Sequence, residues 1–470
     1  MFRIVKIGSD NLIDPVCFGV RLNASLLLLI ALSGVLPTPT FRVEVVDDSN
    51  GWPVPLVELE TTHHLRYVSD NAGVITIDAP ELFGVSTWFH VRGHGYGVDA
   101  DGFGYQGVRL KPTAGESITV RVKRKLPAKR IGRLTGGGLF AESQKLGERS
   151  DWREQRIFGC DSVQNAVLNE RLFWIWGDTT LANYPLGRFH SIGATTPRQP
   201  LSSLHPPLSL RYNYFTDADG VPDNLAKLAG SGPTWLFGLV TLPDDQQQDQ
   251  MGATYSKIKD GLTEYEKGLC IWNQDARRFD PLKVVWRQSE LQSRPPPMPH
   301  GHAILWTDPE GIRWALFGDP FPSIRCRATW EDWSSPERWQ PVAAPPAITA
   351  KDSGTTVVPH RGAIAWNDYR GRWVAVFTQK DGDSSSLGEI WYTESSSPLG
   401  PWSSAIKIVT HDRYTFYNPQ LHPDWVPDGS PILLFEGTYT NTFSGNPTAT
   451  PRYDYNQILY RLDLDELSRD

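Results

Sequence analysis

Four carboxylates in the later part of the chain stand at the ends of short apolar segments, where they are suited to acid–base chemistry. They are Asp161, Asp178, Asp319 and Glu436. Hydrolysis of a glycosidic bond needs two carboxyl groups, one to protonate the leaving oxygen and one to activate water or attack the anomeric carbon. One of them must stay protonated near neutral pH, which crowding by like charge achieves. We therefore predict that Asp161 is the base or nucleophile, with Asp178 or Glu436 as the acid.

Other polar and aromatic residues at similar places are predicted to bind the substrate. His302 and Arg361 are suited to recognising hydroxyl or carboxylate groups, because the guanidinium group offers a planar fork of donors. Trp235 is predicted to stack on a sugar face. The full substrate-binding prediction comprises His190, Trp235, His302, Asp319, Arg361 and Asn418. The alternative is that the polar residues are simply solvated hairpin ends and that Trp235 packs in a core.

A repeat beginning near residue 155 must position these side chains. Each copy has a strand, a turn, an aromatic-rich strand and then a small or charged residue. Four copies span residues 160–178, 300–319, 361–379 and 418–436, and a less regular one begins at 232 and resumes at 252. Five copies with about four strands each predict an all-β fold in which a five-bladed β-propeller spans residues 135–465. The closing strand is expected from residues 457–463 or from the segment near Gly136, and an irregular β-sandwich is the alternative.

The propeller geometry explains why these residues belong together. The start of the first strand and the end of the second strand of a blade lie on the same face, and adjacent strands are about 4.8 Å apart. The predicted neighbours are Asp161 with Asp178, His302 with Asp319, Arg361 with Gln379, and Asn418 with Glu436, with Thr234 and Trp235 in the irregular copy. The segments 183–190 and 439–443 are expected at the rim of the same pocket.

The N-terminal part reads differently. Residues 41–127 alternate with the two-residue period of strands, at 41–46, 54–60, 87–92 and 117–123, and turn-forming clusters separate them. This pattern predicts a small β-sandwich before the propeller. The histidines of this part, His63, His64, His90 and His94, are interpreted as surface or turn residues, and no metal site is predicted.

The composition argues against nucleic acid as a partner, and the first residues predict export from the cytoplasm. The net charge of −7 gives no basic footprint for nucleic acid. The apolar run at residues 25–35 is short and is followed by Pro37 and Pro39, which predicts a signal peptide with its n-region over residues 1–38. We expect a secreted or periplasmic monomer without a membrane span after cleavage. Cys160, Cys270 and Cys326 would remain, which leaves one disulfide and one buried thiol open.

Two family resemblances follow from these segments. The sandwich is similar to the transthyretin-like domain of carboxypeptidase regulatory proteins. The propeller, with an aspartate opening its first blade, resembles the arabinanase and β-xylosidase clan of glycoside hydrolases and the invertase clan. The pattern Asp161 with Trp176-Gly-Asp-Thr179 is closer to a formerly uncharacterised propeller family that includes endo-D-arabinanases, and residues 396–402 resemble the blade-end motif of these groups. The chain lacks an obvious equivalent of every catalytic acid of the arabinanase clan.

These observations predict a carbohydrate-active protein, in first place a glycoside hydrolase whose partner is a polysaccharide or oligosaccharide and which needs no cofactor. Two alternatives remain. A polysaccharide lyase would abstract a proton beside a uronate carboxyl group, with His302, Arg361 and Tyr439 as its base and neutralising cation. A non-catalytic glycan-binding propeller would hold the sugar without releasing a product.

Overall fold

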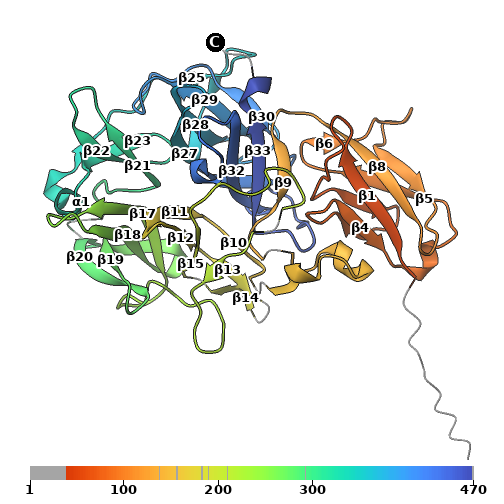
Figure 1. Ribbon diagram of the computed structural model, residues 1–470, viewed down its shortest axis with the longest axis horizontal. Helices are drawn as coiled ribbons and strands as arrows, with labels where there is room; N and C mark the ends of the chain where they lie inside the picture. The colour runs from red at the N-terminus through yellow and green to blue at the C-terminus, as the bar shows by residue number, and fades with distance from the viewer. Residues whose placement is uncertain are drawn as a thin grey trace, which may run out of the picture. The chain divides into compact units, whose positions relative to one another are not determined.

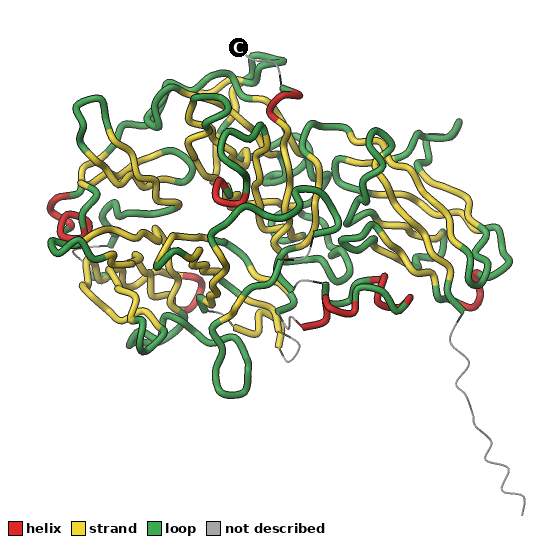
Figure 2. The backbone as a smooth tube through the Cα atoms, viewed as in Figure 1, coloured by secondary structure: helices red, strands yellow, loops and turns green. Residues whose placement is uncertain are grey.

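The computed structural model describes residues 39–467 except 137, 155–156, 182–183, 189, 209, 290 and 292. The predicted signal peptide at residues 1–38 lies outside this range. Strands make up almost all regular structure, and helices are short (Figure 2). In the described part of the chain the one α-helix is α1, Trp330–Trp333, and no helix is long and apolar enough to cross a bilayer.

Two four-stranded sheets form the N-terminal part. One has the order β4-β1-β8-β6 and the other β3-β2-β5-β7. Their strands are β1 (Phe41–Asp47), β2 (Glu58–Thr61), β3 (Arg66–Val68), β4 (Val74–Ile77), β5 (Thr87–Arg92), β6 (Tyr96–Gly97), β7 (Gly107–Leu110) and β8 (Ser117–Arg124). Alternate residues of β1, such as Val43 and Val45, enter one core with Leu59 and Phe89 of the other sheet. A β-sandwich follows from this shared core, as the two-residue periodicity predicts.

Five further four-stranded sheets follow, and in each the strands lie in the order of a propeller blade (Figure 1). Blade 1 contains β11 (Gln164–Leu168), β12 (Arg171–Trp176), β15 (Ile192–Pro197) and β16 (Asn213–Tyr214); blade 2 contains β17 (Thr234–Pro243), β18 (Asp249–Lys259), β19 (Thr263–Asn273) and β20 (Arg278–Arg287). Blade 3 contains β21 (His302–Thr307), β22 (Arg313–Gly318), β23 (Pro322–Arg327) and β24 (Gln340–Pro341); blade 4 contains β27 (Pro359–Asn367), β28 (Arg372–Gln379), β29 (Ile390–Ser395) and β30 (Ile406–Val409). The fold is therefore a five-bladed β-propeller preceded by a small β-sandwich.

Blade 5 closes the ring with strands from both ends of the propeller. It consists of β31 (Thr415–Leu421), β32 (Ile432–Thr440), β33 (Asn456–Asp463) and, at its outer edge, β9 (Lys129–Arg133). The first strands of successive blades contact one another, and β31 meets β11 through hydrogen bonds from Asn418 Nδ2 to Ser162 Oγ and from Gln420 Nε2 to Asn165 Oδ1. Residues 129–133, which lie before the predicted propeller start at residue 135, thus supply a blade strand.

Blade 2 differs from the sequence prediction of an irregular copy. Its four strands have 10, 11, 11 and 10 residues, more than the corresponding strands of any other blade in the described chain. The copy looks irregular in sequence because its hairpins are longer, so the aromatic and turn residues fall at other intervals. All three cysteines of the described chain, Cys160, Cys270 and Cys326, are buried free thiols, and no disulfide joins any two of them.

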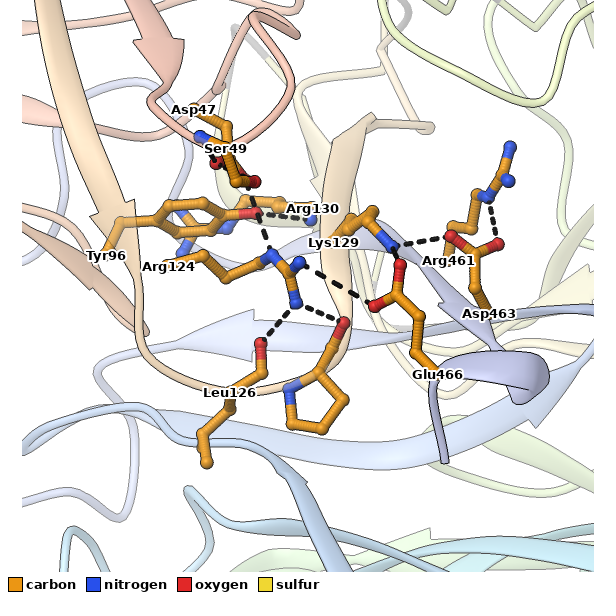
Figure 3. Close-up of polar contacts among 11 residues, drawn as sticks. Asp47, Ser49, Tyr96, Arg124, Leu126, Lys129, Arg130, Arg461, Asp463 and Glu466 are labelled. Carbon is orange, nitrogen blue, oxygen red and sulfur yellow. Dashed lines mark hydrogen bonds and ion pairs between the residues drawn. The ribbon is translucent and has the colours of Figure 1, made fainter. Parts of the chain in front are cut away.

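Two basic residues of β9, Lys129 and Arg130, make buried polar contacts, and those of Arg130 join blade 5 to the sandwich (Figure 3). The buried Arg130 guanidinium donates to the carbonyl oxygens of Pro55 and Leu56 at 2.9 and 3.1 Å and to the hydroxyl of Tyr460. Lys129 Nζ lies 2.6 Å from a carboxylate oxygen of Glu466. Lys129 and Arg130 are therefore buried although both side chains are basic.

Candidate active site

The first blade contains a break that brings two aspartates together. Its hairpin continues beyond the blade as β10 (Gly159–Cys160) and β13 (Thr179–Leu181), which form a separate three-stranded sheet with β14 (Tyr184–Arg188). Asp161 and Asp178 lie at the crossing between the two sheets. The backbone N–H of Asp161 donates to the carbonyl of Asp178 at 3.2 Å, and that of Gly177 donates to the carbonyl of Asp161 at 2.9 Å. The structure thus makes Asp161 and Asp178 neighbours, as the hairpin geometry predicts.

Asp161 is held by hydroxyl donors from blades 1 and 5. The Tyr417 hydroxyl donates to Asp161 Oδ2 at 2.7 Å, and Tyr455 and Ser162 also donate to this carboxylate. Burial raises the pKa of Asp161, while the three hydrogen bonds and the charge of Arg361 act in the opposite direction. Donors of this kind favour the ionised form of a carboxyl group, so Asp161 is prepared to carry negative charge in a site that otherwise disfavours it.

Gly177 is required at its position because of this carboxylate. A Cβ atom on residue 177 would lie 2.3 Å from Asp161 Oδ1, well inside any permitted contact. The absence of a side chain at residue 177 therefore lets the Asp161 carboxylate lie directly above the strand end that carries Asp178.

Asp178 has the opposite charge preference. Burial and the neighbouring charge of Asp161 raise the pKa of Asp178 to about 8, although a hydrogen bond donated by the Trp235 indole lowers it. At neutral pH Asp178 is therefore mainly protonated while Asp161 is the better candidate for ionisation. Two neighbouring carboxyl groups whose surroundings favour different charge states are the usual sign of an acid and base pair. The Trp235 indole N–H is engaged by Asp178, so Trp235 orients the acid.

A second charged group belongs to blades 3 and 4. Arg361 lies in a register shift of β27, where the bulged backbone turns its side chain, and its Nε is 3.5 Å from Asp319 Oδ2. His300 Nδ1 is 3.8 Å from the same oxygen, and the backbone N–H of Gly362 donates to Oδ1 at 2.9 Å. Burial raises the pKa of Asp319 to about 6, although Arg361 and the Gly362 N–H lower it. The Asp319 side chain is 16% exposed and that of Arg361 36%, so both remain open to solvent.

The two histidines of blade 3 are uncharged. Burial, with the charge of Arg361 as a further cause, lowers the pKa of both His300 and His302 to about 3. His302 begins β21 opposite Gly318, beside Asp319 as predicted. Neutral imidazoles can exchange hydrogen bonds with sugar hydroxyl groups, and they leave Arg361 as the cation whose charge reaches both Asp161 and Asp319.

Asn418 closes the ring beside the aspartates. It lies in a register shift of β31 with φ of +51°, and its Nδ2 donates to Ser162 Oγ at 2.6 Å. Its side-chain oxygen is buried, and the described residues provide no partner for it. Asn418 is therefore placed near Asp161, where its amide nitrogen joins blades 5 and 1 and its amide oxygen is available.

Glu436, the other candidate acid, is buried beside His422. Its side chain is 0% exposed, and Oε1 is 2.9 Å from Nε2 of the equally buried His422, whose ring packs against Trp174 and Trp425. In β32 Glu436 shares a face with Leu434, which belongs to the core between blades 5 and 1. Glu436 as the catalytic acid therefore stays a prediction, and its contact with His422 gives it a place in the core between blades 5 and 1.

His190 is half-buried immediately before β15, and β14 follows the first hairpin. Residues 182–183 and 189 of the predicted rim segment lie outside the described residues. Sequence reasoning missed Tyr417, Tyr455 and His300. The nearest signals were that Tyr417 precedes Asn418 and that His300 is two residues before His302, but a tyrosine that orients a carboxylate has no spacing of its own.

No family model matches the chain, and no curated protein matches it. Solved structures match at low identity. A putative exo-β-1,3-galactanase from Bifidobacterium bifidum s17 is 11% identical, with a TM-score of 0.38 over 64% of this chain and 86% of its own. An exo-1,5-α-L-arabinanase from a bovine ruminal metagenomic library is 12% identical, with a TM-score of 0.37 over 65% and 92% of the two chains. An N-acetylgalactosamine deacetylase from F. plautii is 13% identical, with a TM-score of 0.38 over 67% and 94%. The last catalyses a different reaction from the first two, so these similarities leave the chemistry to be argued from the site.

Proposed function

We propose that the protein is a glycoside hydrolase that cleaves an uncharged polysaccharide or oligosaccharide at the face of the propeller where Asp161 and Asp178 meet. The observation that supports this most is the pair of adjacent carboxyl groups, of which Asp161 accepts three hydroxyl hydrogen bonds and Asp178 has a raised pKa. Burial and Asp161 keep Asp178 protonated, while Tyr417, Tyr455 and Ser162 stabilise charge on Asp161.

In this proposal Asp178 donates its proton to the glycosidic oxygen as the bond to the anomeric carbon breaks. Asp161 attacks that carbon or removes a proton from the incoming water. Asp161 and Asp178 face each other across the first hairpin. Residues directly opposite in an antiparallel pair have Cβ atoms about 4.5–5.5 Å apart, and carboxyl groups about 5 Å apart are typical of retaining enzymes. We therefore favour Asp161 as the nucleophile and retention of anomeric configuration. Asp178, once deprotonated, would then act as the base for water.

Charge in the site favours a neutral sugar over a uronate. Asp161 and Asp319 are the carboxylates whose charge Arg361 partly balances, so a further carboxylate from the substrate would add a negative charge near two others. Arg361 is suited to donate hydrogen bonds to sugar hydroxyl groups, and its ion-pair partner Asp319 is suited to accept them. His300 and His302, both neutral, extend this polar surface.

The set proposed for a lyase is not assembled. Tyr439 is 2% exposed, stacks on Tyr414 at 4.2 Å between ring centroids, and shares a 2.7 Å hydrogen bond with Thr450. Arg361 is engaged by Asp319 instead of standing free for a uronate. These contacts make proton abstraction by Tyr439 beside a uronate unfavourable in this fold.

Export, a monomeric state and kinship with the endo-D-arabinanase-containing propeller family complete the proposal, and they rest on the sequence patterns alone. A matching proposal is that residues 41–127 form a transthyretin-like domain. Neither part is needed for the reaction at Asp161 and Asp178.

The test is a panel of plant, algal and microbial polysaccharides incubated with the protein and with Asp161→Asn and Asp178→Asn variants. We expect new reducing ends with the wild type and none with Asp161→Asn. An unsaturated product detected by ultraviolet absorbance would instead identify a lyase. Binding of a glycan without any product, in wild type and variants alike, would identify a non-catalytic glycan-binding protein and overturn the proposal.

A further inference from the structure

An exposed phenylalanine stands beside the aspartates in an unusual backbone conformation. Phe443 follows β32, is 68% exposed, and has φ of +64°. A bulky residue in the left-handed region is uncommon, and its backbone is strained. Water around an exposed aromatic ring is a further cost. Neither cost is offset by burial in a core, which makes the position of this side chain informative.

The loop that carries Phe443 is fixed by its own hydrogen bonds. The backbone N–H of Asn441 donates to Asp454 Oδ1 at 2.7 Å, and the Ser444 hydroxyl donates to the Asn441 carbonyl at 2.6 Å. From the neighbouring strand β31, the Thr415 hydroxyl donates to the carbonyl of Thr442 at 2.6 Å. These bonds hold the residues before and after Phe443, so its left-handed backbone is imposed by the loop and its ring is presented in one place.

That place adjoins the proposed catalytic pair. The Phe443 and Tyr417 ring centroids are 6.2 Å apart in an edge-on arrangement with a 77° angle between planes. The Tyr417 hydroxyl is the donor to Asp161. Phe443 is therefore one aromatic ring away from the carboxylate that would attack the sugar, and it lies on the solvent side because Tyr417 is only 9% exposed.

We propose that Phe443 is a substrate-contacting residue that stacks on the apolar face of a sugar ring beyond the two rings that the cleaved bond joins. The face of an aromatic ring carries partial negative charge and attracts the partly positive C–H groups of a saturated ring. A rigid ring also costs little conformational entropy when the sugar binds. This inference rests on the proposed glycosidase function and assigns one binding subsite of that same site, which would make the enzyme prefer chains over the shortest substrates.

The test compares Phe443→Ala, Phe443→Asn and Phe443→Trp with the wild type. Asn tolerates the left-handed region, so Phe443→Asn removes the ring without adding backbone strain. Phe103→Ala is the matched control, because Phe103 is 90% exposed on a loop of the sandwich. The probes are arabino-, xylo- and galacto-oligosaccharides of about two and about six units, since a subsite beyond the cleaved bond is filled only by the longer chains.

We expect Phe443→Ala and Phe443→Asn to raise KM for the longer probe about tenfold with little change in kcat, as loss of one stacking contact predicts. Phe443→Trp and Phe103→Ala should stay within about twofold of wild type, which is below the energy of one such contact. An unchanged KM in Phe443→Ala, or an equal loss in Phe103→Ala, would overturn the inference while leaving the proposed function intact.

A wild type that releases no product would instead overturn the proposed function. In that case calorimetric titration of wild type and Phe443→Asn with the longer probes decides the inference by itself. Weaker binding to Phe443→Asn than to wild type would support a sugar-stacking role, and equal binding or no binding to either protein would refute it.

Discussion

The protonated state of Asp178 has a consequence for stability that can be measured without knowing the substrate. Its pKa rises from an ordinary 3.8 to about 8 in the folded protein. Below about pH 4 the group is protonated in both folded and unfolded chains and has no differential effect. Between about pH 4 and 8 the unfolded chain releases the proton while the folded chain retains it, so each pH unit lowers the free energy of unfolding by about 1.4 kcal/mol.

Replacing Asp178 with Asn removes this effect while keeping the shape and an acceptor for the Trp235 indole. The variant should match wild type in stability near pH 4 and exceed it increasingly as pH rises, up to about 6 kcal/mol near pH 8 when the whole shift is counted. It should also be inactive. A variant that loses activity and gains stability is the expected behaviour of a residue kept in an unfavourable environment for function.

The assay is thermal and urea unfolding of wild type and Asp178→Asn at intervals from pH 4 to pH 9, which are the limits that the two pKa values set. Asp428→Asn, at an exposed position, is the matched control and should show no such trend. In an Asp161→Asn background the gain from Asp178→Asn should shrink, because the Asp161 charge is one cause of the raised pKa of Asp178. A stability difference that stays flat from acid to alkaline pH would refute the assignment of Asp178 as a protonated acid.

Three further substitutions separate the roles of neighbouring residues. Tyr417→Phe removes a donor to Asp161 and should raise the pKa of Asp161. The acid limb of the kcat/KM profile should therefore move to higher pH by about one unit. An acid limb that does not move would contradict the role of this hydroxyl. Gly177→Ala places a Cβ 2.3 Å from Asp161 Oδ1. It should lower kcat at least about tenfold, while circular dichroism shows that the fold is retained. Turnover equal to that of the wild type would show that the Asp161 carboxylate can move aside without loss of activity. Glu436→Gln alters the buried 2.9 Å contact with His422 and should destabilise the protein by about 1–3 kcal/mol, while activity per folded molecule stays near wild type. A stable but inactive variant would support Glu436 as a catalytic residue.

The strand pattern of the sequence predicts most of the fold. Residues 41–46, 87–92 and 117–123 coincide closely with β1, β5 and β8, and the repeated hairpins coincide with the first two strands of four blades. Blade 2 was harder to recognise because its strands are longer than the others. The strand β9 was missed because a basic segment such as 129–133 has no apolar alternation, and its pairing with β33 depends on a partner more than three hundred residues away.

The site was predictable where hairpin geometry alone decides it and unpredictable where register or tertiary contact decides it. Asp161 and Asp178 are neighbours because they face each other across one hairpin. Tyr417 was missed because it reaches Asp161 across the contact between blades 5 and 1, beside a register shift in β31 that no sequence spacing reveals. The burial of Glu436 against His422 likewise depends on a tertiary contact that the repeat does not encode.

The most direct test of the central claim is the crystal structure of Asp161→Asn bound to an uncleaved oligosaccharide that the wild-type protein cleaves. The account predicts that the glycosidic oxygen accepts a hydrogen bond from Asp178 and that the anomeric carbon lies beside the residue 161 side chain. A sugar chain bound with its scissile bond at any other carboxyl group, or on another face of the propeller, would contradict it.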